Sequence, residues 1–236
     1  MTTSLHNAVV FVTGANGGLG LEFVKQSLER GAAKVYATAR NSRTWDDSRI
    51  VPLTLDVTNQ DSIDAAVAAA SDTTIVINNA GIYSHVDSLT DGNIDDIRRM
   101  FEVNFFGAIQ VTRGFAPILG ANGGGAFVNV HSVLSWLGIA GSYSAAKAAI
   151  WSASNSFRTE LAPQGTHVLG LHIGYTDTPM TAGLDVPKNT PATVVADTFD
   201  GLEAGAYEVL GDEVSANVKA ALSGTIEDLY PQLARS

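Results

Sequence analysis

Short apolar runs rich in β-branched residues recur along the chain and alternate with stretches of helical pattern. The runs cover 9–14, 34–39, 50–57, 73–81, 126–132 and 167–174, with a shorter one at 207–211. They are continuous rather than alternating in polarity, which is typical of strands buried on both faces of a parallel sheet. The sequence therefore predicts an α/β fold, a doubly wound parallel sheet with helices on both faces.

Amphipathic or alanine-rich stretches between these runs predict the helices. Their ranges are 19–30, 61–70, 95–119, 143–161 and 191–204. No linker or repeat interrupts the 236 residues, so we expect one domain over 1–236. The segment 176–192 holds three prolines and breaks the pattern, which predicts a mobile loop that contacts substrate.

The composition excludes several kinds of partner. Lys and Arg number 14 against 24 Asp and Glu, a formal net charge of −10, and basic residues form no long run. Such a chain is a poor candidate for binding nucleic acid or an anionic membrane. Because no run could cross a bilayer and no secretory signal pattern opens the chain, we expect a cytoplasmic protein. Cysteine is absent and the five histidines lack ligand spacing, so no metal site is expected.

A glycine-rich turn, TGANGGLG at 13–20, follows the first apolar run directly. Gly14, Gly18 and Gly20 permit a tight turn and let the backbone approach a pyrophosphate, while the following helix offers unpaired N–H groups. A plain strand–helix turn is the alternative for a lone glycine triplet. Its place in the first βα turn favours a dinucleotide-binding sheet, the Rossmann fold.

The end of the second apolar run bears on which dinucleotide binds. NAD-binding sheets usually carry an acidic residue there, whereas this chain has Ala39 followed by Arg40. A guanidinium can bind a ribose 2′-phosphate in bidentate fashion, so we predict NADP(H) in preference to NAD(H). Arg43 could assist, and the alternative is that both arginines are simply solvated.

Tyr143 and Lys147 are four residues apart and share one face of a predicted helix. A nearby ammonium and the helix N-terminus would favour the phenolate, so that Tyr143 can donate a proton to a carbonyl oxygen or remove one from an alcohol. Ser132, at the end of the fifth run, can hydrogen-bond the same oxygen as charge develops on it. For an isolated Tyr-x-x-x-Lys pair, packing and snorkelling would be the ordinary explanation.

Taken together, these motifs resemble those of the short-chain dehydrogenase/reductase family. In the family's order, they are TGANGGLG at 13–20, NNAG at 78–81, EVNFFG around Asn104, NVHS ending at Ser132, and YSAAK at 143–147. The resemblance implies an NADP(H)-dependent carbonyl reductase or alcohol dehydrogenase that forms a homotetramer or homodimer. It also implies that Lys147 bonds the nicotinamide ribose and that Asn104 holds a water which relays protons to Lys147.

The expected site divides into catalytic, cofactor-binding and substrate-contacting residues. The catalytic set is Asn104, Ser132, Tyr143 and Lys147. The cofactor set adds Gly14, Asn16, Gly18, Leu19, Gly20, Arg40, Asp56, Val57, Asn78, Ala80, Gly81, Gly174, Thr176 and Thr178 to Tyr143 and Lys147. The substrate set is apolar and comprises Ile82, Leu134, Trp136, Leu137, Ile139, Tyr175, Met180 and Leu184. An apolar pocket with polar groups at only one place suits a small hydrophobic ketone or aldehyde. Alternatively, several of these residues could be core or subunit contacts.

Two departures from the family pattern leave alternatives open. Ser132 lies eleven residues before Tyr143, a short separation for the family, so Ser135 is an alternative to Ser132. Ile173 and Gly174 stand where a proline-glycine pair is usual. The alternative function is a cofactor-binding sensor or scaffold without turnover, against which the intact Tyr–Lys pair argues.

Overall fold

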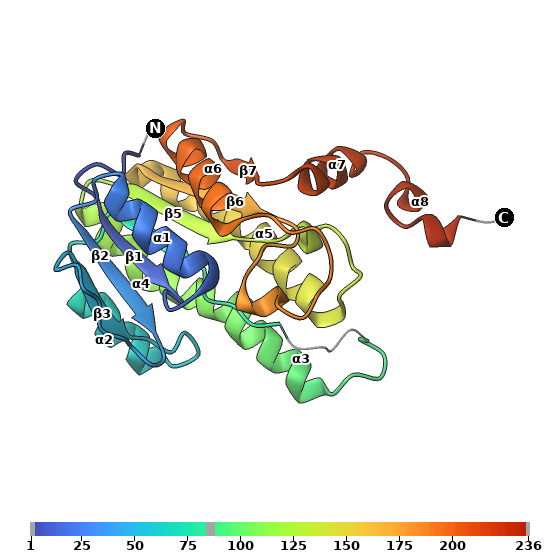
Figure 1. The fold of residues 1–236 in the computed structure, drawn as a ribbon, viewed down its shortest axis with the longest axis horizontal. Helices are drawn as coiled ribbons and strands as arrows, with labels where there is room; N and C mark the ends of the chain where they lie inside the picture. The colour runs from blue at the N-terminus through green and yellow to red at the C-terminus, as the bar shows by residue number, and fades with distance from the viewer. Residues whose placement is uncertain (1–2, 84–87, 235–236) are drawn as a thin grey trace.

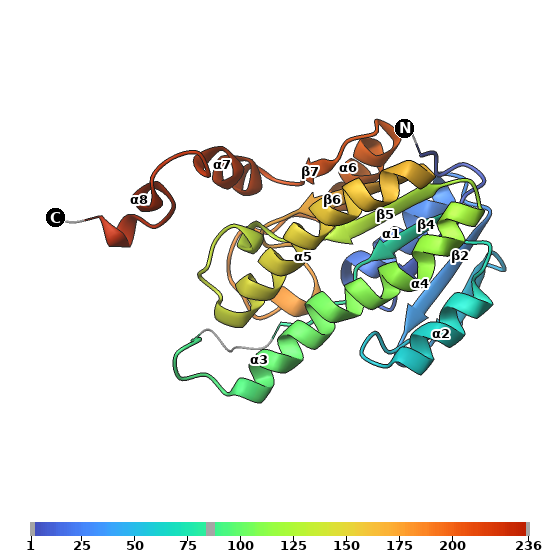
Figure 2. The same cartoon turned by 180° about the vertical axis from the view of Figure 1, so that it is seen from behind.

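The computed structural model describes residues 3–83 and 88–234 as a parallel sheet between two layers of helices (Figures 1 and 2). The strand order is β3-β2-β1-β4-β5-β6-β7, and every neighbouring pair is parallel. The strands are β1 (Val9–Thr13), β2 (Lys34–Ala39), β3 (Ile50–Thr54), β4 (Ile75–Asn78), β5 (Gly125–Val130), β6 (Thr166–His172) and β7 (Glu208–Leu210). The predicted doubly wound sheet is confirmed.

Helices cover both faces of the sheet. The first face carries α1 (Gly18–Glu29) and α6 (Pro191–Glu203), which lie in front of the strands in Figure 1. The second face carries α2 (Gln60–Ala69), α4 (Gly107–Ala121) and α5 (Gly141–Leu161), seen in front in Figure 2. Each layer buries its own apolar cluster against the strands. The continuous apolar runs are therefore explained, because each central strand meets helices on both sides.

The predicted helix at 95–119 is interrupted in the structure. It begins as α3 (Ile94–Phe101), passes through a π-helical turn at Glu102–Phe106 and continues as α4. A π-turn adds one residue to the helical repeat and often occurs at functional sites. Here it contains Asn104, one of the predicted catalytic residues.

The C-terminal segment contains two helices that the pattern did not predict, α7 (Glu213–Ala221) and α8 (Ile226–Leu229). They extend beyond the sheet as an arm, drawn in red in Figures 1 and 2. Both are short and largely exposed, so their sequences lack the broad apolar stripe of a core helix. Within residues 3–83 and 88–234, we find no helix of the length and apolarity that crossing a membrane requires.

The topology brings distant parts of the sequence to one edge of the sheet. All strands point the same way, so the turns after β1, β4, β5 and β6 meet at their carboxyl ends. The strand order reverses between β1 and β4, and ligands of open α/β sheets bind in the crevice at such a point. The glycine-rich turn and the NNAG segment lie on either side of it.

The packing of Phe115 in α4 predicts the largest stability effect in this layer. Its ring lies 4.4 Å from that of Phe11 in β1, and the side chain is fully buried. We expect Phe115→Ala to lower the free energy of unfolding by about 3–5 kcal/mol, because it removes an aromatic ring and leaves a cavity. Urea denaturation measures this loss. Ile94→Ala, at an exposed position of α3, is the matched control and should change stability by less than about 1 kcal/mol.

Candidate active site

The glycine-rich turn has a shape that only glycine permits. Gly14 and Gly18 have φ angles of +69° and +53°, and a Cβ on Gly20 would lie 2.1 Å from the Gly14 carbonyl oxygen. Gly17 occupies the N-cap of α1 without a side-chain cap, and the first turn of α1 has no acidic residue. The first amides of α1 are thus available to an anion, and the helix dipole favours one there. This cradle fits the pyrophosphate of a dinucleotide.

Residues after β4 and β6 close around this turn. Asn79 donates its side-chain amide to the carbonyls of Thr13 (2.9 Å) and Gly14 (3.2 Å). Thr178, in the loop after β6, is so near that a Cβ on Gly18 would lie 3.1 Å from its methyl group. The loop after β6 therefore contacts the glycine-rich turn at this edge of the sheet, and its cofactor contacts stay a prediction.

The side chain of Asn78 is directed into the core. Its amide donates to the Thr112 hydroxyl (3.0 Å) and to the Asn129 side-chain oxygen (2.9 Å). Sequence reasoning named Asn78 as a cofactor contact and missed Asn79, whose side chain holds the glycine-rich turn. The sequence contained this information, because side chains of adjacent strand residues point to opposite faces. Asn78 and Asn79 therefore cannot both be directed toward the glycine-rich turn.

Arg40 follows β2 and Asp56 follows β3, so both lie at the carboxyl edge of the sheet. Arg40 is exposed beyond β2, which leaves its guanidinium accessible to a ligand. Asp56 accepts hydrogen bonds from the backbone N–H of Thr58 (2.9 Å) and from its hydroxyl (2.7 Å). These bonds, aided by the charge of Arg40, hold the pKa of Asp56 below its ordinary value. That Arg40 meets a ribose 2′-phosphate stays a prediction.

Ser132 and Tyr143 meet at the carboxyl end of β5. Ser132 lies near enough to Tyr143 to lower its pKa, and the Ser132 hydroxyl donates to the Ile173 carbonyl (3.4 Å). Ser132 is 7% exposed and accepts a bond from the Leu134 N–H (3.1 Å), while Ser135 turns back to accept from the Ser132 N–H (3.3 Å). The structure thus brings Ser132 to Tyr143 and uses the Ser135 hydroxyl to cap the intervening turn.

The ionisation of Tyr143 differs from expectation. Burial, together with the nearby Tyr83, raises the pKa of Tyr143 to about 12, and Ser132 opposes this only in part. The lowered pKa that Lys147 and the helix N-terminus predict for Tyr143 is not found, because burial outweighs the lowering effects. The Lys147 ammonium lies 5.6 Å from the centre of the Tyr143 ring and donates to the Val130 carbonyl (2.8 Å) instead. Tyr143 is accordingly a protonated hydroxyl at neutral pH, suited to donating a proton.

Lys147 is a buried cation with one hydrogen-bond acceptor, the Val130 carbonyl, among the residues that the structure describes. Its side chain is 6% exposed, and burial lowers its pKa to about 8. Desolvation disfavours the charged form, and the single bond to Val130 offsets only part of that cost. Two of the three ammonium protons remain to be bonded by a ligand hydroxyl or by water. This fits the ribose contact implied for Lys147.

Asn104 joins the π-turn to the segment after β4. Its side-chain oxygen accepts from the Ile82 N–H (3.0 Å), and its amide donates to the Ile82 carbonyl (2.9 Å) and to the Met100 sulfur (2.8 Å). A Cβ on Gly81 would lie 2.8 Å from the same oxygen, so only glycine fits there. Asn104 therefore fixes the NNAG segment, while its water relay stays a prediction.

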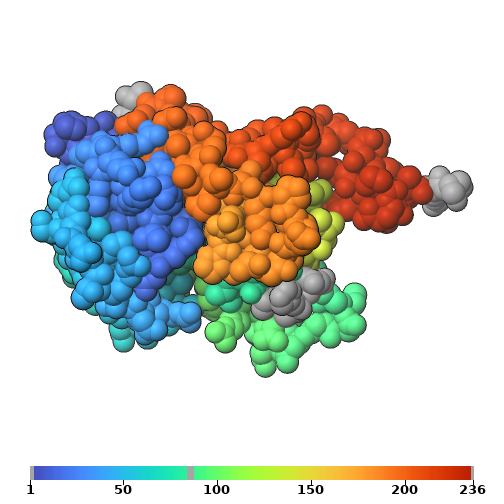
Figure 3. All heavy atoms as spheres, viewed as in Figure 1, coloured from blue at the N-terminus to red at the C-terminus, as the bar shows by residue number. Residues whose placement is uncertain are grey.

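The predicted substrate residues lie on loops at the same edge. Ile139, Tyr175, Met180 and Leu184 are well exposed, whereas Trp136 is buried. The segment after β6 forms much of the orange surface in Figure 3, beside the blue glycine-rich region. Its base is held by bonds from the Gly174 N–H to Asp212 (2.5 Å) and from the Asp177 N–H to the Asn189 carbonyl (2.9 Å). Mobility of 176–192 stays a prediction.

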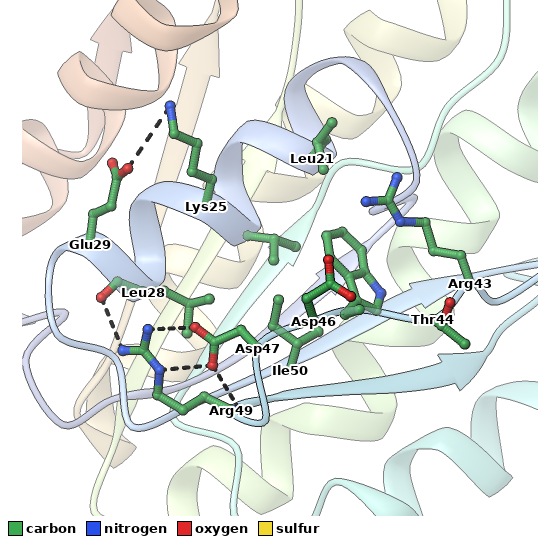
Figure 4. Close-up of a pocket in the computed structure, with 12 residues that line it drawn as sticks. Leu21, Lys25, Leu28, Glu29, Arg43, Thr44, Asp46, Asp47, Arg49 and Ile50 are labelled. Atoms are coloured by element: carbon green, nitrogen blue, oxygen red, sulfur yellow. Dashed lines mark hydrogen bonds and ion pairs between the residues drawn. The ribbon is translucent and has the colours of Figure 1, made fainter.

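A separate surface pocket of about 390 Å³ lies beside α1 (Figure 4). It is lined from one side by residues of α1 such as Lys25 and from the other by the loop before β3, where Arg43 lies 4.0 Å above the Trp45 ring. Arg43, which could assist in binding a 2′-phosphate, lines it, whereas the other residues predicted to bind cofactor or to act in catalysis do not. Over residues 3–83 and 88–234, His, Cys, Asp and Glu side chains form no group of three or more that could hold a metal ion.

The burial of Lys147 predicts a pH dependence of stability. Its pKa of about 8 lies below the ordinary 10.5, so between these values the unfolded chain binds a proton that the folded chain has released. The free energy of unfolding should therefore rise with pH across this window relative to that of Lys147→Met. Denaturation curves at pH 7.5, 9 and 10 measure the difference. Lys25→Met, at an exposed position, should show the same change of unfolding free energy with pH as the wild type. The same pH dependence in Lys147→Met as in the wild type would contradict the burial argument.

Comparisons with known proteins agree with this geometry. The family model described as short chain dehydrogenase matches residues 8–188. A cis-4-hydroxycyclohexanecarboxylate dehydrogenase of Sinomonas cyclohexanicum is 33% identical over 201 residues, 80% of each chain. A short chain dehydrogenase of Burkholderia cenocepacia J2315, solved in complex with NADP, is 34% identical with a TM-score of 0.92 and covers 99% of this chain and 100% of its own.

One further solved structure supports the fold alone. A short chain dehydrogenase/reductase from Burkholderia phymatum in complex with NAD has a TM-score of 0.84 at 20% identity and covers 99% of this chain and 98% of its own. The family match extends over the glycine-rich turn, the NNAG segment and the Ser132, Tyr143 and Lys147 positions. This chain belongs to the short-chain dehydrogenase/reductase family of oxidoreductases.

Proposed function

We propose that this protein is an NADPH-dependent carbonyl reductase that reduces a small hydrophobic ketone or aldehyde to an alcohol, and that the reaction is reversible. The observation that carries the proposal is that Ser132, Tyr143 and Lys147 lie together at the end of β5, where the Lys147 ammonium lies 5.6 Å from the Tyr143 ring and Ser132 lowers the pKa of Tyr143. A neutral phenol is the form that can donate a proton to a carbonyl oxygen.

Three of the four predicted catalytic side chains act directly on the ligands in this proposal. Tyr143 donates the proton to the substrate oxygen, and Ser132 donates a hydrogen bond to the same oxygen as negative charge develops. Lys147 binds the nicotinamide ribose with the protons that Val130 leaves free. When bound, the nicotinamide supplies or accepts the hydride. The phenolate left on Tyr143 is stabilised by Ser132 and by the positive charge of Lys147 until it regains a proton through water.

The preference for NADP(H) rests on Arg40. Its exposed guanidinium follows Ala39, which stands where an acidic residue would repel a 2′-phosphate. The Burkholderia cenocepacia relative, at 34% identity, was solved with NADP. For the substrate, the Sinomonas relative is named for a cyclic secondary alcohol, so cyclic ketones belong in the test panel beside aryl and alkyl ketones. A cytoplasmic location and a homotetramer or homodimer also remain predictions.

The proposed reaction is tested by Tyr143→Phe, which removes one oxygen atom. We expect NADPH oxidation with a cyclohexanone or acetophenone panel to fall by at least about 100-fold, because the proton donor is lost. Loss of absorbance at the reduced-nicotinamide band measures it. Tyr207→Phe, at an exposed site, is the control and should keep wild-type turnover. Wild-type protein that binds NADPH tightly and reduces none of the panel would favour the sensor alternative instead.

The cofactor preference is tested by Arg40→Asp. We expect the KM for NADPH to rise about 10- to 100-fold, since a charged hydrogen bond to phosphate is replaced by repulsion. The KM for NADH should change by less than about threefold. Arg43→Asp is the matched control, because its guanidinium already stacks on Trp45. Equal effects of Arg40→Asp on both cofactors would mean that Arg40 does not meet the 2′-phosphate.

A further inference from the structure

The segment 133–142 that joins Ser132 to Tyr143, called the bridge below, contains one buried aromatic residue, Trp136. Its side chain is 7% exposed, and its indole N–H has no hydrogen-bond partner among the described residues. The Trp136 ring instead stacks on His172, with ring centres 4.0 Å apart and planes inclined by 13°. Trp151 meets it edge-on at 5.9 Å, and the Lys219 ammonium lies 5.0 Å from its centre. Ring contacts therefore hold Trp136.

Glu208 connects the three groups that contact Trp136. One carboxylate oxygen accepts from the Trp151 indole (3.0 Å) and lies 3.4 Å from His172 Nε2, and the other pairs with Lys219. Although burial opposes its ionisation, the bonds from Lys219 and Trp151 keep the pKa of Glu208 below its ordinary value. We call His172, Trp151, Lys219 and Glu208 the Trp136 clamp. It draws on β6, α5, α7 and β7, so it exists only in the folded chain.

The clamp acts close to Ser132. Trp136 donates its backbone N–H to Val133 (3.0 Å), and Val133 donates to Ile173 (2.8 Å), the residue after His172. His172 Nδ1 also lies 3.4 Å from the Ser132 carbonyl oxygen. Because the bridge is short, anchoring Trp136 removes most of the freedom that Ser132 would otherwise have relative to Tyr143.

We propose that Trp136 is a positioning residue, which the Trp136 clamp anchors so that the Ser132 hydroxyl is held at Tyr143 for the reaction proposed above. The expected effect on kcat rests on that proposed function. The expected effect on the order of the bridge rests on the contacts alone. The clamp also accounts for the short bridge, because stacking of Trp136 on His172 fixes a bridge that has fewer residues than is common in the family.

Kinetics of clamp variants supply the first test. Trp136→Ala and His172→Ala should each lower kcat roughly 10- to 100-fold, because a displacement on the order of 1 Å at a reacting group costs that much. The KM for NADPH should stay within about twofold of wild type, since the glycine-rich turn is untouched. Trp136→Phe, which keeps a ring on His172, should recover most of kcat. His167→Ala is the control: this buried histidine of β6 bonds to Ala206 and not to the bridge.

A double-mutant cycle distinguishes a loss of kcat that arises from displacement of Ser132 from a loss that arises elsewhere in the fold. If the clamp works through Ser132, adding His172→Ala to Ser132→Ala should cost less than about twofold further in kcat. Additive losses would overturn the proposal, because they would show that His172 acts by another route. Full activity of both Trp136→Ala and His172→Ala would overturn it as well.

A measurement that needs no turnover keeps the inference independent of the proposed reaction. Hydrogen exchange of the peptide covering 133–142 should be at least about tenfold faster in Trp136→Ala and His172→Ala than in wild type. Exchange at 14–20 should be unchanged, and Trp136→Phe should be protected like wild type. If wild-type protein reduces no carbonyl yet shows this exchange pattern, the proposed function fails while the clamp stands. Unchanged exchange at 133–142 in both alanine variants would refute the clamp even in an active reductase.

Discussion

The bond from the buried Lys147 ammonium to the Val130 carbonyl joins the two elements on which the site depends. It ties α5 to the end of β5 at 2.8 Å. Ser132 lies two residues beyond Val130, and Tyr143 lies one helical turn before Lys147, so this contact fixes the two segments that carry the Ser132 and Tyr143 hydroxyls. The cost of burying the cation appears as the lowered pKa of Lys147.

Burial has opposite consequences for the two titratable members of this site. It makes the Tyr143 hydroxyl a weaker acid and the Lys147 ammonium a stronger one, because each neutral form is favoured away from water. Before a ligand enters, Tyr143 is therefore protonated at neutral pH, the form that a proton donor must have, and the Lys147 amine is less basic than usual. A bound ribose and substrate would supply further hydrogen bonds to Lys147 and thereby favour its charged form.

Much of the fold could be predicted because strands and helices of a doubly wound sheet have distinct local patterns. The central strands and α1, α2, α5 and α6 agree with the predicted ranges to within a few residues. The π-turn at Asn104 was not predictable, since one extra residue hardly alters helical periodicity. The C-terminal arm was missed for a different reason: short exposed helices carry little apolar pattern, and Lys219 matters only through Glu208 and Trp136.

By itself, the sequence determined the strand–helix alternation, the glycine-rich turn and the pairing of Tyr143 with Lys147, because all three depend on residues near one another in the chain. Only the tertiary structure decided which asparagine holds the glycine-rich turn, which way burial shifts the pKa of Tyr143, and that Glu208 supports Trp136. These depend on desolvation and on contacts between residues dozens of positions apart. No local pattern encodes them, because the same residues would be solvated and separate in the unfolded chain.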